Sequence, residues 1–244
     1  EPLLRVEAAG IPYLIIYIFE PSIINYPDTS RRHLQFVYHS INALNKTLNK
    51  FNRTVDVFYS ETIDALKYIN TLFNIKGLFS YNESGTAISW QRDKQIKFFC
   101  EKLNIQWKES KRDGIIRGIK NRNYWSKQWA NTMHSAIIKN NYSHSTLTPL
   151  KHPYKIPVKL EQRLKEYPPN YQPAGEYNAW RYLKSFADQR GFNYQNNISK
   201  PHESRKSCSR LSPFLAWGNI SIKQAFQFIG THPNGTKNNR AFSA

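Results

Sequence analysis

The chain of 244 residues carries 35 lysines and arginines against 17 aspartates and glutamates, which gives a formal net charge of +18. Its length suits one α/β domain or one and a half domains, and 40% apolar residues supply ample material for a packed core. Two cysteines exclude a disulfide framework, and the apolar run over residues 13–19 is too short to cross a bilayer, so we expect a cytoplasmic protein without membrane association.

The first hundred residues alternate between the apolar patterns of helices and strands. An opening helix is expected to end at Gly10, and further helices are expected over residues 30–48, capped by Thr29-Ser30, and over 61–73 and 88–103. Strands are expected over residues 13–19, 54–59, 75–79 and 105–107. Continuous apolar strands separated by helices are typical of a parallel sheet that is covered on both faces. The sequence therefore predicts an α/β fold, with a doubly wound, Rossmann-like parallel sheet over residues 1–112.

The pattern changes after residue 112. Prolines punctuate residues 113–174, where one short helix carries Trp125 and Trp129, and this stretch is expected to be a connector on the surface. Residues 175–244 are expected to begin an all-helical domain. Its first helix ends near Gly191, a second starts at Ser212-Pro213, and a third is capped by Ser221.

The positive charge is spread along the whole chain. A broad electropositive surface favours nucleic acid as the partner, with an anionic membrane second. A basic surface that is merely solvated is the remaining interpretation.

The most informative segment is the run Ser-Cys-Ser-Arg-Leu-Ser-Pro over residues 207–213. Serine at the N-cap and proline at the first helical position would start a short helix at Ser212-Pro213. The amides and dipole of that turn favour an anion, and Arg210 adds a charge whose forked donors suit phosphate. The segment thus predicts a phosphate-holding element, although a capped surface helix with an incidental arginine fits the same residues.

This segment, followed by Trp-Gly-Asn-Ile-Ser over residues 217–221, resembles the flavin-binding signature of the DNA photolyase/cryptochrome family. The order of an α/β region, a long connector and a helical region also resembles that family. Two short motifs give weaker support, because they occur in the same order along the chain as in the family: Arg31-Arg32 and Arg92-Asp93. The resemblance is to class I photolyases, and it implies a fragment that lacks the start of the α/β domain and most of the helical domain that holds FAD.

The resemblance assigns part of a flavin site. Tyr194 matches a tyrosine that contacts the flavin nucleotide in the family. The matches to the phosphate-holding segment are Cys208, Ser209, Arg210, Leu211 and Ser212. Cys208 stands where threonine is usual, so one hydroxyl donor is absent there while the backbone amide remains.

Two departures from the family pattern concern DNA and the antenna chromophore. An Arg-Asp pair near the DNA backbone is replaced by Ile198-Ser199, so phosphate contacts would fall to Lys200, Arg205 or Lys206. The Asn-Glu pair of folate-binding members is replaced by Ile88-Ser89. A folate antenna is therefore not implied, and a different second chromophore or none is equally open.

The resemblance implies a light-driven repair reaction. A pyrimidine dimer in damaged DNA is flipped into a pocket over the flavin, excited reduced FAD donates an electron, the dimer splits and the electron returns. The residues that line the dimer pocket would follow Ala244. No metal or acid–base constellation is required, and the isolated histidines are expected to be solvated or hydrogen-bonded: they are His134, His144 and His152. The tryptophans are expected in the core rather than in an electron relay: they are Trp125, Trp129, Trp180 and Trp217.

Three functions are compatible with these observations. The first is a flavin-dependent, blue-light-driven DNA photolyase, favoured because the positive charge suits a DNA partner. The second is a cryptochrome-type photoreceptor with the same cofactor and no repair. The third is a non-enzymatic nucleic-acid-binding or nucleotide-binding α/β protein in which Arg210 serves only charge or capping. A monomer is expected in each case.

Overall fold

The computed structural model describes residues 1–143 and 149–234, which form two compact units. Unit 1 consists of Glu1–Arg112 and Ile138–Pro168, and unit 2 of Asp113–Ile137 and Pro169–Ala244. One of the divisions between the units falls after Arg112. The stretch over 113–174 is divided between the two units, whereas the sequence pattern predicts one connector. Among the described residues, no helix is both long and apolar enough to span a membrane.

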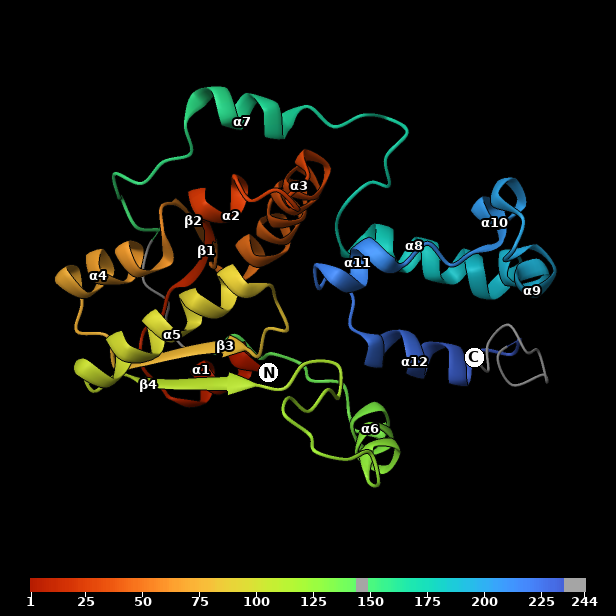
Figure 1. The fold of residues 1–244 in the computed structure, drawn as a ribbon, viewed down its shortest axis with the longest axis horizontal. Coiled ribbons are helices and arrows are strands. Elements are labelled where there is room, and N and C mark those ends of the chain that lie inside the picture. The colour runs from red at the N-terminus through yellow and green to blue at the C-terminus, as the bar shows by residue number, and fades with distance from the viewer. Residues whose placement is uncertain (144–148, 235–244) are drawn as a thin grey trace. The chain divides into compact units, whose positions relative to one another are not determined.

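Unit 1 alternates strands and helices as expected (Figure 1). Its strands are β1 (Ile15–Phe19), β2 (Val55–Tyr59), β3 (Gly77–Tyr81) and β4 (Gln106–Ser110). Its helices are α1 (Pro2–Ala8), α2 (Pro21–Ile24), α3 (Arg31–Leu48), α4 (Thr62–Leu72), α5 (Ala87–Lys102) and α7 (Val158–Lys165), with a 3₁₀ turn η1 (Asn49–Phe51). The long helix α3 begins where the sequence predicts, because the Ser30 hydroxyl accepts the amide of His33 at its N-cap.

The strands pair in parallel, which confirms the predicted α/β class. β1 lies beside β2 from the pair Ile15–Val55 to the pair Phe19–Tyr59. β3 lies beside β4 from Gly77–Gln106 to Tyr81–Ser110. The described residues thus hold two parallel pairs. Since β1 and β3 each lead into a helix before their partner strand, each pair is joined by a β-α-β crossover.

Helices cover both faces of the β1–β2 pair. On one face, Phe19 and Val55 pack with Val37 and Ile41 of α3 and with Leu164 of α7. On the other face, Phe58 packs with Ala65 and Ile69 of α4, and the neighbouring cluster of α4 and α5 also contacts Ile16. Alternate residues of one strand therefore point into different cores, as expected of a sheet that is buried on both faces.

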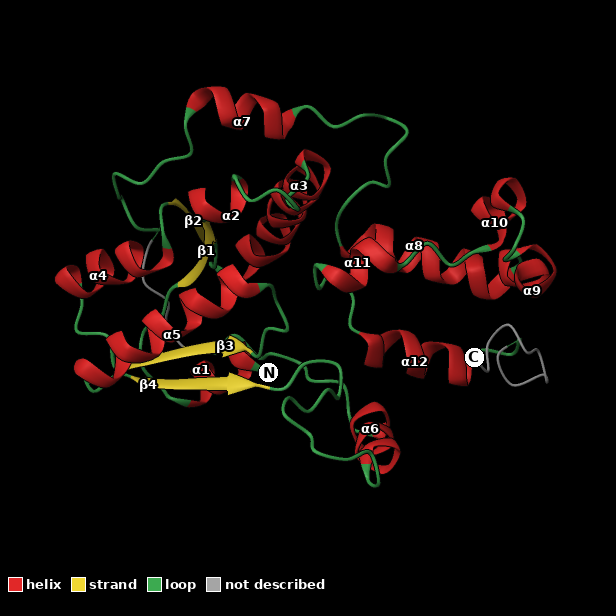
Figure 2. Cartoon of the chain, in the orientation of Figure 1, coloured by secondary structure: helices red, strands yellow, loops and turns green. Residues whose placement is uncertain are grey.

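Helices and turns of 3₁₀ helix are the only regular secondary structure in the described residues of unit 2 (Figure 2). Its elements are α6 (Trp125–His134), α8 (Glu176–Asp188), the 3₁₀ turn η2 (Arg190–Asn193), α9 (Tyr194–Asn197), α10 (Pro201–Ser207), α11 (Ser212–Ala216) and α12 (Ile222–Thr231). The face of α8 over Ala179, Leu183 and Phe186 is buried, and Phe214 of α11 is fully buried. Ser221 caps α12 in a reciprocal capping box with Gln224, as the sequence predicts for the cap.

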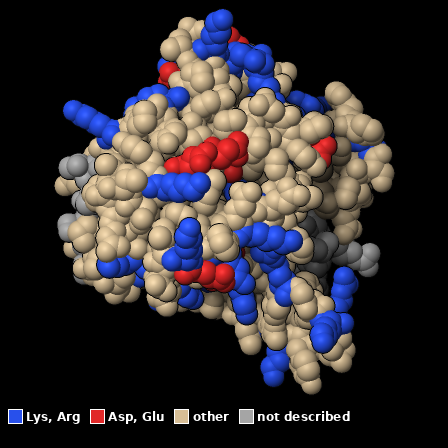
Figure 3. Space-filling model, turned by 60° about the vertical axis from the view of Figure 1, so that its left-hand side comes forward, with Lys and Arg blue, Asp and Glu red and all other residues tan. Residues whose placement is uncertain are grey.

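Basic side chains dominate the charged surface. In the face drawn in Figure 3, lysines and arginines are scattered widely and acidic side chains are few. This distribution agrees with the net charge of +18.

Candidate functional site: a phosphate-holding turn

The segment from Cys208 to Ser212 is a turn between two short helices of unit 2. α10 ends at Ser207, and Cys208 is extended, with φ −72° and ψ 154°. Arg210 has a φ of +59°, in the left-handed region that a side chain normally disfavours by about 1–2 kcal/mol. Leu211 returns to the right-handed region and is buried, which anchors the turn. The centre of the predicted segment is therefore a residue other than glycine in the left-handed conformation.

Arg190 fixes the carbonyl side of this turn. Its guanidinium donates to the carbonyls of Cys208 and Ser209, to the Tyr182 carbonyl at 2.8 Å and to the Ser185 hydroxyl at 3.0 Å. Burial lowers the pKa of Arg190, and the neighbouring charge of Arg210 lowers it further. The side chain stays charged, because guanidinium does not lose its proton in proteins. The carbonyls of the turn thus accept hydrogen bonds from one half-buried cation.

Gln172 holds the centre of the turn. This side chain is buried, and its amide donates to the carbonyl of Arg210. This hydrogen bond satisfies the carbonyl of Arg210, and so offsets part of the free-energy cost of its left-handed backbone conformation. With Arg190 and Gln172 engaging successive carbonyls, the conformation of the turn is set by the rest of unit 2.

The amide side of the turn is left open. Within the described residues, the amides of Ser209, Arg210 and Leu211 donate to no backbone carbonyl. Ser209 and Arg210 are half-buried, and Leu211 is buried. Consecutive residues of opposite handedness direct their amides to the same side, which creates a small anion-binding concavity. The turn thus presents unpaired amides where the sequence predicts a phosphate.

Arg210 carries a charge that no carboxylate neutralises within the described part of the chain. Its guanidinium carbon lies 5.9 Å from the centre of the Tyr182 ring, and that of Arg190 lies 5.7 Å from the same ring. Two like charges beside one ring repel each other, and a bound anion would relieve that repulsion. The amides and Arg210 together fit a pyrophosphate group.

The predicted cap at Ser212 is wrong. The N-cap of α11 is Leu211, so Ser212 is the first helical residue, Pro213 the second, and the exposed Ser212 side chain forms no capping bond. The reason is the left-handed Arg210, which lets Leu211 adopt helical angles one residue early. α11 has only five residues, so its helix dipole would add little to the anion affinity that the sequence predicts here.

The remaining predicted residues lie in the same unit. Tyr194 begins α9 and packs edge-to-face against Phe186, with ring centres 6.1 Å apart. Within the described chain, Tyr194 makes no hydrogen bond to the turn. Lys200 is the exposed N-cap residue of α10, and Arg205 and Lys206 are exposed in its last turn.

Sequence reasoning missed Arg190 and Gln172, which hold the turn from outside it. Neither lies in a recognisable motif, and both act on backbone carbonyls, which leave no mark on the sequence. The available signal for Arg190 is an arginine directly after the end of a helix, followed by Gly191.

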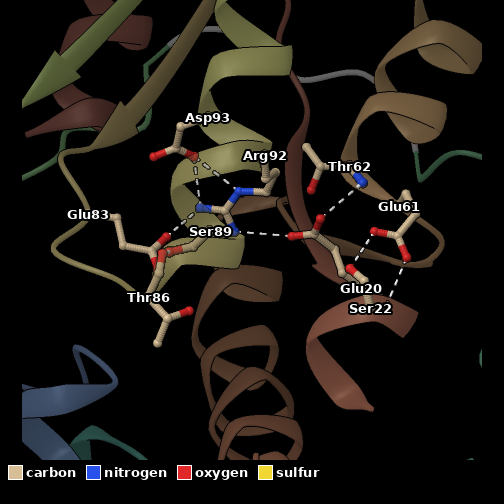
Figure 4. Close-up of polar contacts among 9 residues, drawn as sticks. All are labelled: Glu20, Ser22, Glu61, Thr62, Glu83, Thr86, Ser89, Arg92 and Asp93. Carbon is tan, nitrogen blue, oxygen red and sulfur yellow. Dashed lines mark hydrogen bonds and ion pairs between the residues drawn. The ribbon is translucent and has the colours of Figure 1, made fainter. Parts of the chain in front are cut away.

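A second polar cluster lies at the carboxyl ends of strands β1 to β3 (Figure 4). Arg92 of α5 donates to Glu20 at 3.1 Å, to Asp93 and to Glu83. Burial alone would lower the pKa of Arg92, but these carboxylates raise it above its usual range. Three carboxylates around one arginine leave excess negative charge at the carboxyl ends of the strands. Parallel sheets commonly bind ligands at this edge. Ser89, at one folate-pair position, is buried and donates to the Thr86 carbonyl.

The isolated histidines and the tryptophans differ in their surroundings. His152 is buried, and its ring stacks on Phe58 with centres 3.9 Å apart; His134 is exposed, and His144 lies outside the described residues. Trp125 and Trp217 are exposed, so their expected place in the core is wrong. No group of metal-ligating side chains occurs within the described residues.

Comparison with solved structures identifies the fold. A bacterial class III photolyase from Agrobacterium tumefaciens matches with a TM-score of 0.77 and 17% identity, over 99% of this chain and 52% of that one. The chain shares the photolyase/cryptochrome fold. A Synechocystis cryptochrome matches with a TM-score of 0.73 and 15% identity, over 99% and 54%. An archaeal photolyase from Sulfolobus tokodaii with two FAD molecules matches at 0.63 and 20%, over 93% and 50%.

The similarity is one of structure. No family model matches the sequence, and no curated protein matches it by sequence comparison. The chain spans about half the length of the solved structures that it resembles.

Proposed function

We propose that the chain holds the pyrophosphate of FAD in a blue-light-driven DNA photolyase that splits pyrimidine dimers. The observation that carries this proposal is the turn at Cys208–Ser212, with its open amides and the unneutralised charge of Arg210. The fold supports it, because the structures that the chain resembles include photolyases, one of them solved with two FAD molecules.

The residues present fit a dinucleotide. Ser209, Arg210 and Leu211 would donate amides to phosphate oxygens, and the Arg210 guanidinium would add a charge-assisted bond. Cys208 would contribute its backbone rather than a hydroxyl. Reduced FAD, when bound, would supply the light-excited electron for dimer cleavage, while the chain supplies position, charge and exclusion of water.

Damaged DNA is the proposed partner. Lys200, Arg205 and Lys206 are exposed at the ends of α10, the helix that leads into the turn. Their side chains would contact DNA phosphates close to the flavin, and such contacts tolerate displacement along the chain.

A folate antenna is not proposed. The cluster around Arg92 surrounds the cation with carboxylates, which disfavour a second anionic group at this edge of the sheet. A second chromophore at this position would have to be neutral or positively charged in the part that meets Glu20 and Glu83.

A cryptochrome-type photoreceptor is the second candidate, supported by the similarity to the Synechocystis cryptochrome. Both candidates use the same flavin turn. Blue light and a dimer-containing oligonucleotide, with flavin fully reduced, separate them, since loss of dimers is expected only for the repair enzyme.

Equilibrium dialysis against FAD tests the turn, with ADP as a probe of the adenosine diphosphate part without the flavin. Arg210→Ala is expected to weaken binding of both by about 1.5–3 kcal/mol, the range of a hydrogen bond to a charged group. Arg181→Ala is the matched control, because Arg181 lies 5.8 Å from the same Tyr182 ring but outside the turn. Equal losses in the two variants, or none in either, would contradict the proposed site.

A further inference from the structure

A second feature of unit 2 lies outside the flavin turn, in the residues leading into α6. After Asp113, no aspartate or glutamate occurs until Glu161. Within the first part of this acid-free run lie four basic residues: Arg117, Lys120, Arg122 and Lys127. All four are exposed, and none has a carboxylate partner within the described residues. This stretch therefore concentrates positive charge that unit 2 does not neutralise internally.

Exposed aromatic side chains accompany these charges. Tyr124 is 69% exposed and Trp125 is 42% exposed. Trp125 stacks on Trp129, one turn further along α6, with ring centres 6.3 Å apart and planes 22° apart. One side of the stack is thus covered by protein, while Tyr124 and Trp125 remain accessible to solvent. Exposed aromatic faces between basic side chains match the pattern that binds unpaired bases and their phosphates.

The aromatic stack rests on a fixed support. Trp129 packs edge-to-face on Phe226 of α12, with ring centres 5.4 Å apart. The Gln227 side chain of α12 donates to the carbonyls of Met133 and Ser135, at 2.7 and 2.8 Å. Because α6 is tied to α12 at both its middle and its end, Trp125 is held in place before any ligand arrives.

We propose that residues 115–129 form a binding surface for single-stranded nucleic acid, here named the α6 surface. Bases stack on Tyr124 and Trp125, and phosphates contact Arg117, Lys120 and Arg122. This binding requires neither flavin nor a lesion, so it is separate from the proposed repair site. The polar residues between the charges, Asn121 and Asn123, supply hydrogen-bonding groups that an apolar membrane interior would not satisfy.

The proposal is tested by measuring the affinity of the chain for a fluorescein-labelled oligothymidylate of about ten nucleotides, a length within the usual site size for such surfaces. Fluorescence anisotropy gives this affinity at several salt concentrations. Trp125→Leu is expected to weaken binding about 5- to 150-fold, as for the loss of one stacked base, and Trp125→Phe to restore most of it. Trp90→Leu is the matched control, because Trp90 is 55% exposed on α5 of unit 1 and Lys94 lies 5.7 Å from its ring.

The charges are tested by the triple variant R117Q/K120Q/R122Q. The negative slope of log affinity against log salt is expected to become shallower by about 2, as for three lost contacts to a single strand. The matched control K46Q/K50Q/K76Q removes three exposed lysines from unit 1 and is expected to leave the slope nearly unchanged.

Several results would overturn the proposal. These are equal losses in the control variants, equal affinity for a duplex of the same length, and no binding at low salt. Vesicles containing phosphatidylserine supply the remaining arm: if they bind the chain through Trp125 and compete fully with the oligonucleotide, the surface recognises membranes instead. Circular dichroism of each variant confirms that the fold is retained, and Trp125→Phe keeps the test valid if Trp125→Leu unfolds.

Discussion

Arginines that are buried or half-buried serve opposite purposes in the two units. In unit 1, Arg53 pairs with the buried carboxylate of Glu7, and Arg92 is surrounded by three carboxylates. In unit 2, Arg190 binds neutral carbonyls and Arg210 lies beside an aromatic ring. Burial acts to lower the pKa of both Arg53 and Arg190. The pKa of Arg53 is nevertheless raised, because its hydrogen bonds to Tyr13 and Glu7 outweigh burial, whereas the pKa of Arg190 is lowered because burial prevails.

The difference separates charge that holds the fold together from charge that is available to a ligand. Unit 1 pairs Arg53 and Arg92 with its own carboxylates. Unit 2 uses one cation to shape a turn and leaves a second beside open amides. We therefore propose an anion as a ligand of unit 2 and not of unit 1.

Removal of Arg53 is expected to give the largest effect on stability. Arg53→Met removes the cation that pairs with the buried carboxylate of Glu7, which keeps only its hydrogen bonds from neutral groups such as the Tyr13 hydroxyl and the Ser143 amide. Breaking a buried ion pair typically costs about 3–5 kcal/mol. Urea unfolding measures the loss. Arg5→Met is the control, because the exposed pair of Arg5 with Glu1 is expected to contribute no more than about 1 kcal/mol. Similar losses in both variants would mean that the buried pair is not special.

Arg190→Met is expected to lower both stability and anion binding. The variant loses hydrogen bonds to the carbonyls of Tyr182, Cys208 and Ser209, so a stability loss of about 1.5–3 kcal/mol is expected. Thermal unfolding and ADP titration measure the two losses. Arg210→Ala is the contrasting variant, with stability changed by no more than about 0.5 kcal/mol and binding weakened. If Arg190→Met unfolds the turn without changing ADP affinity, the turn does not bind the anion.

The smallest expected effect is a pH dependence in unit 1. Burial lowers the pKa of His152 below its ordinary value of 6.5, and the charge of Lys155 lowers it further. Just below pH 6.5 the unfolded chain therefore binds more protons than the folded chain, so stability falls as the pH drops and recovers as it rises. Melting temperatures between about pH 5 and pH 8 measure this. His152→Phe, which keeps a ring against Phe58, should flatten the curve, and an unchanged curve would assign the effect to other groups.

Local signals in the sequence predicted much of the fold. Ser30 and Ser221 are correct helix caps because capping depends on residues within one turn. Apolar spacing predicted the helix–strand alternation of unit 1 for the same reason. The helices α7 and α10 were missed, because frequent prolines and mixed charges hide their short apolar faces.

The residue types of the proposed phosphate turn were predicted from the sequence, but the side chains that hold the turn were not. Arg210 and its neighbours are recognisable from their order in the sequence, but their conformation depends on Gln172 and Arg190, which are distant along the chain. The cap assigned to Ser212 failed because the left-handed conformation of Arg210 is imposed by those distant contacts. Contacts to backbone carbonyls depend on the fold, so composition and spacing do not reveal them.

The most direct test is the amide spectrum of ¹⁵N-labelled protein during titration with ADP. We expect the amide signals of Ser209, Arg210 and Leu211 to move downfield together and to saturate, because each would donate to a phosphate oxygen. In Arg210→Ala the same signals should move at higher ADP concentration. Binding of ADP with these three signals unchanged would contradict the assignment of the turn as the pyrophosphate site.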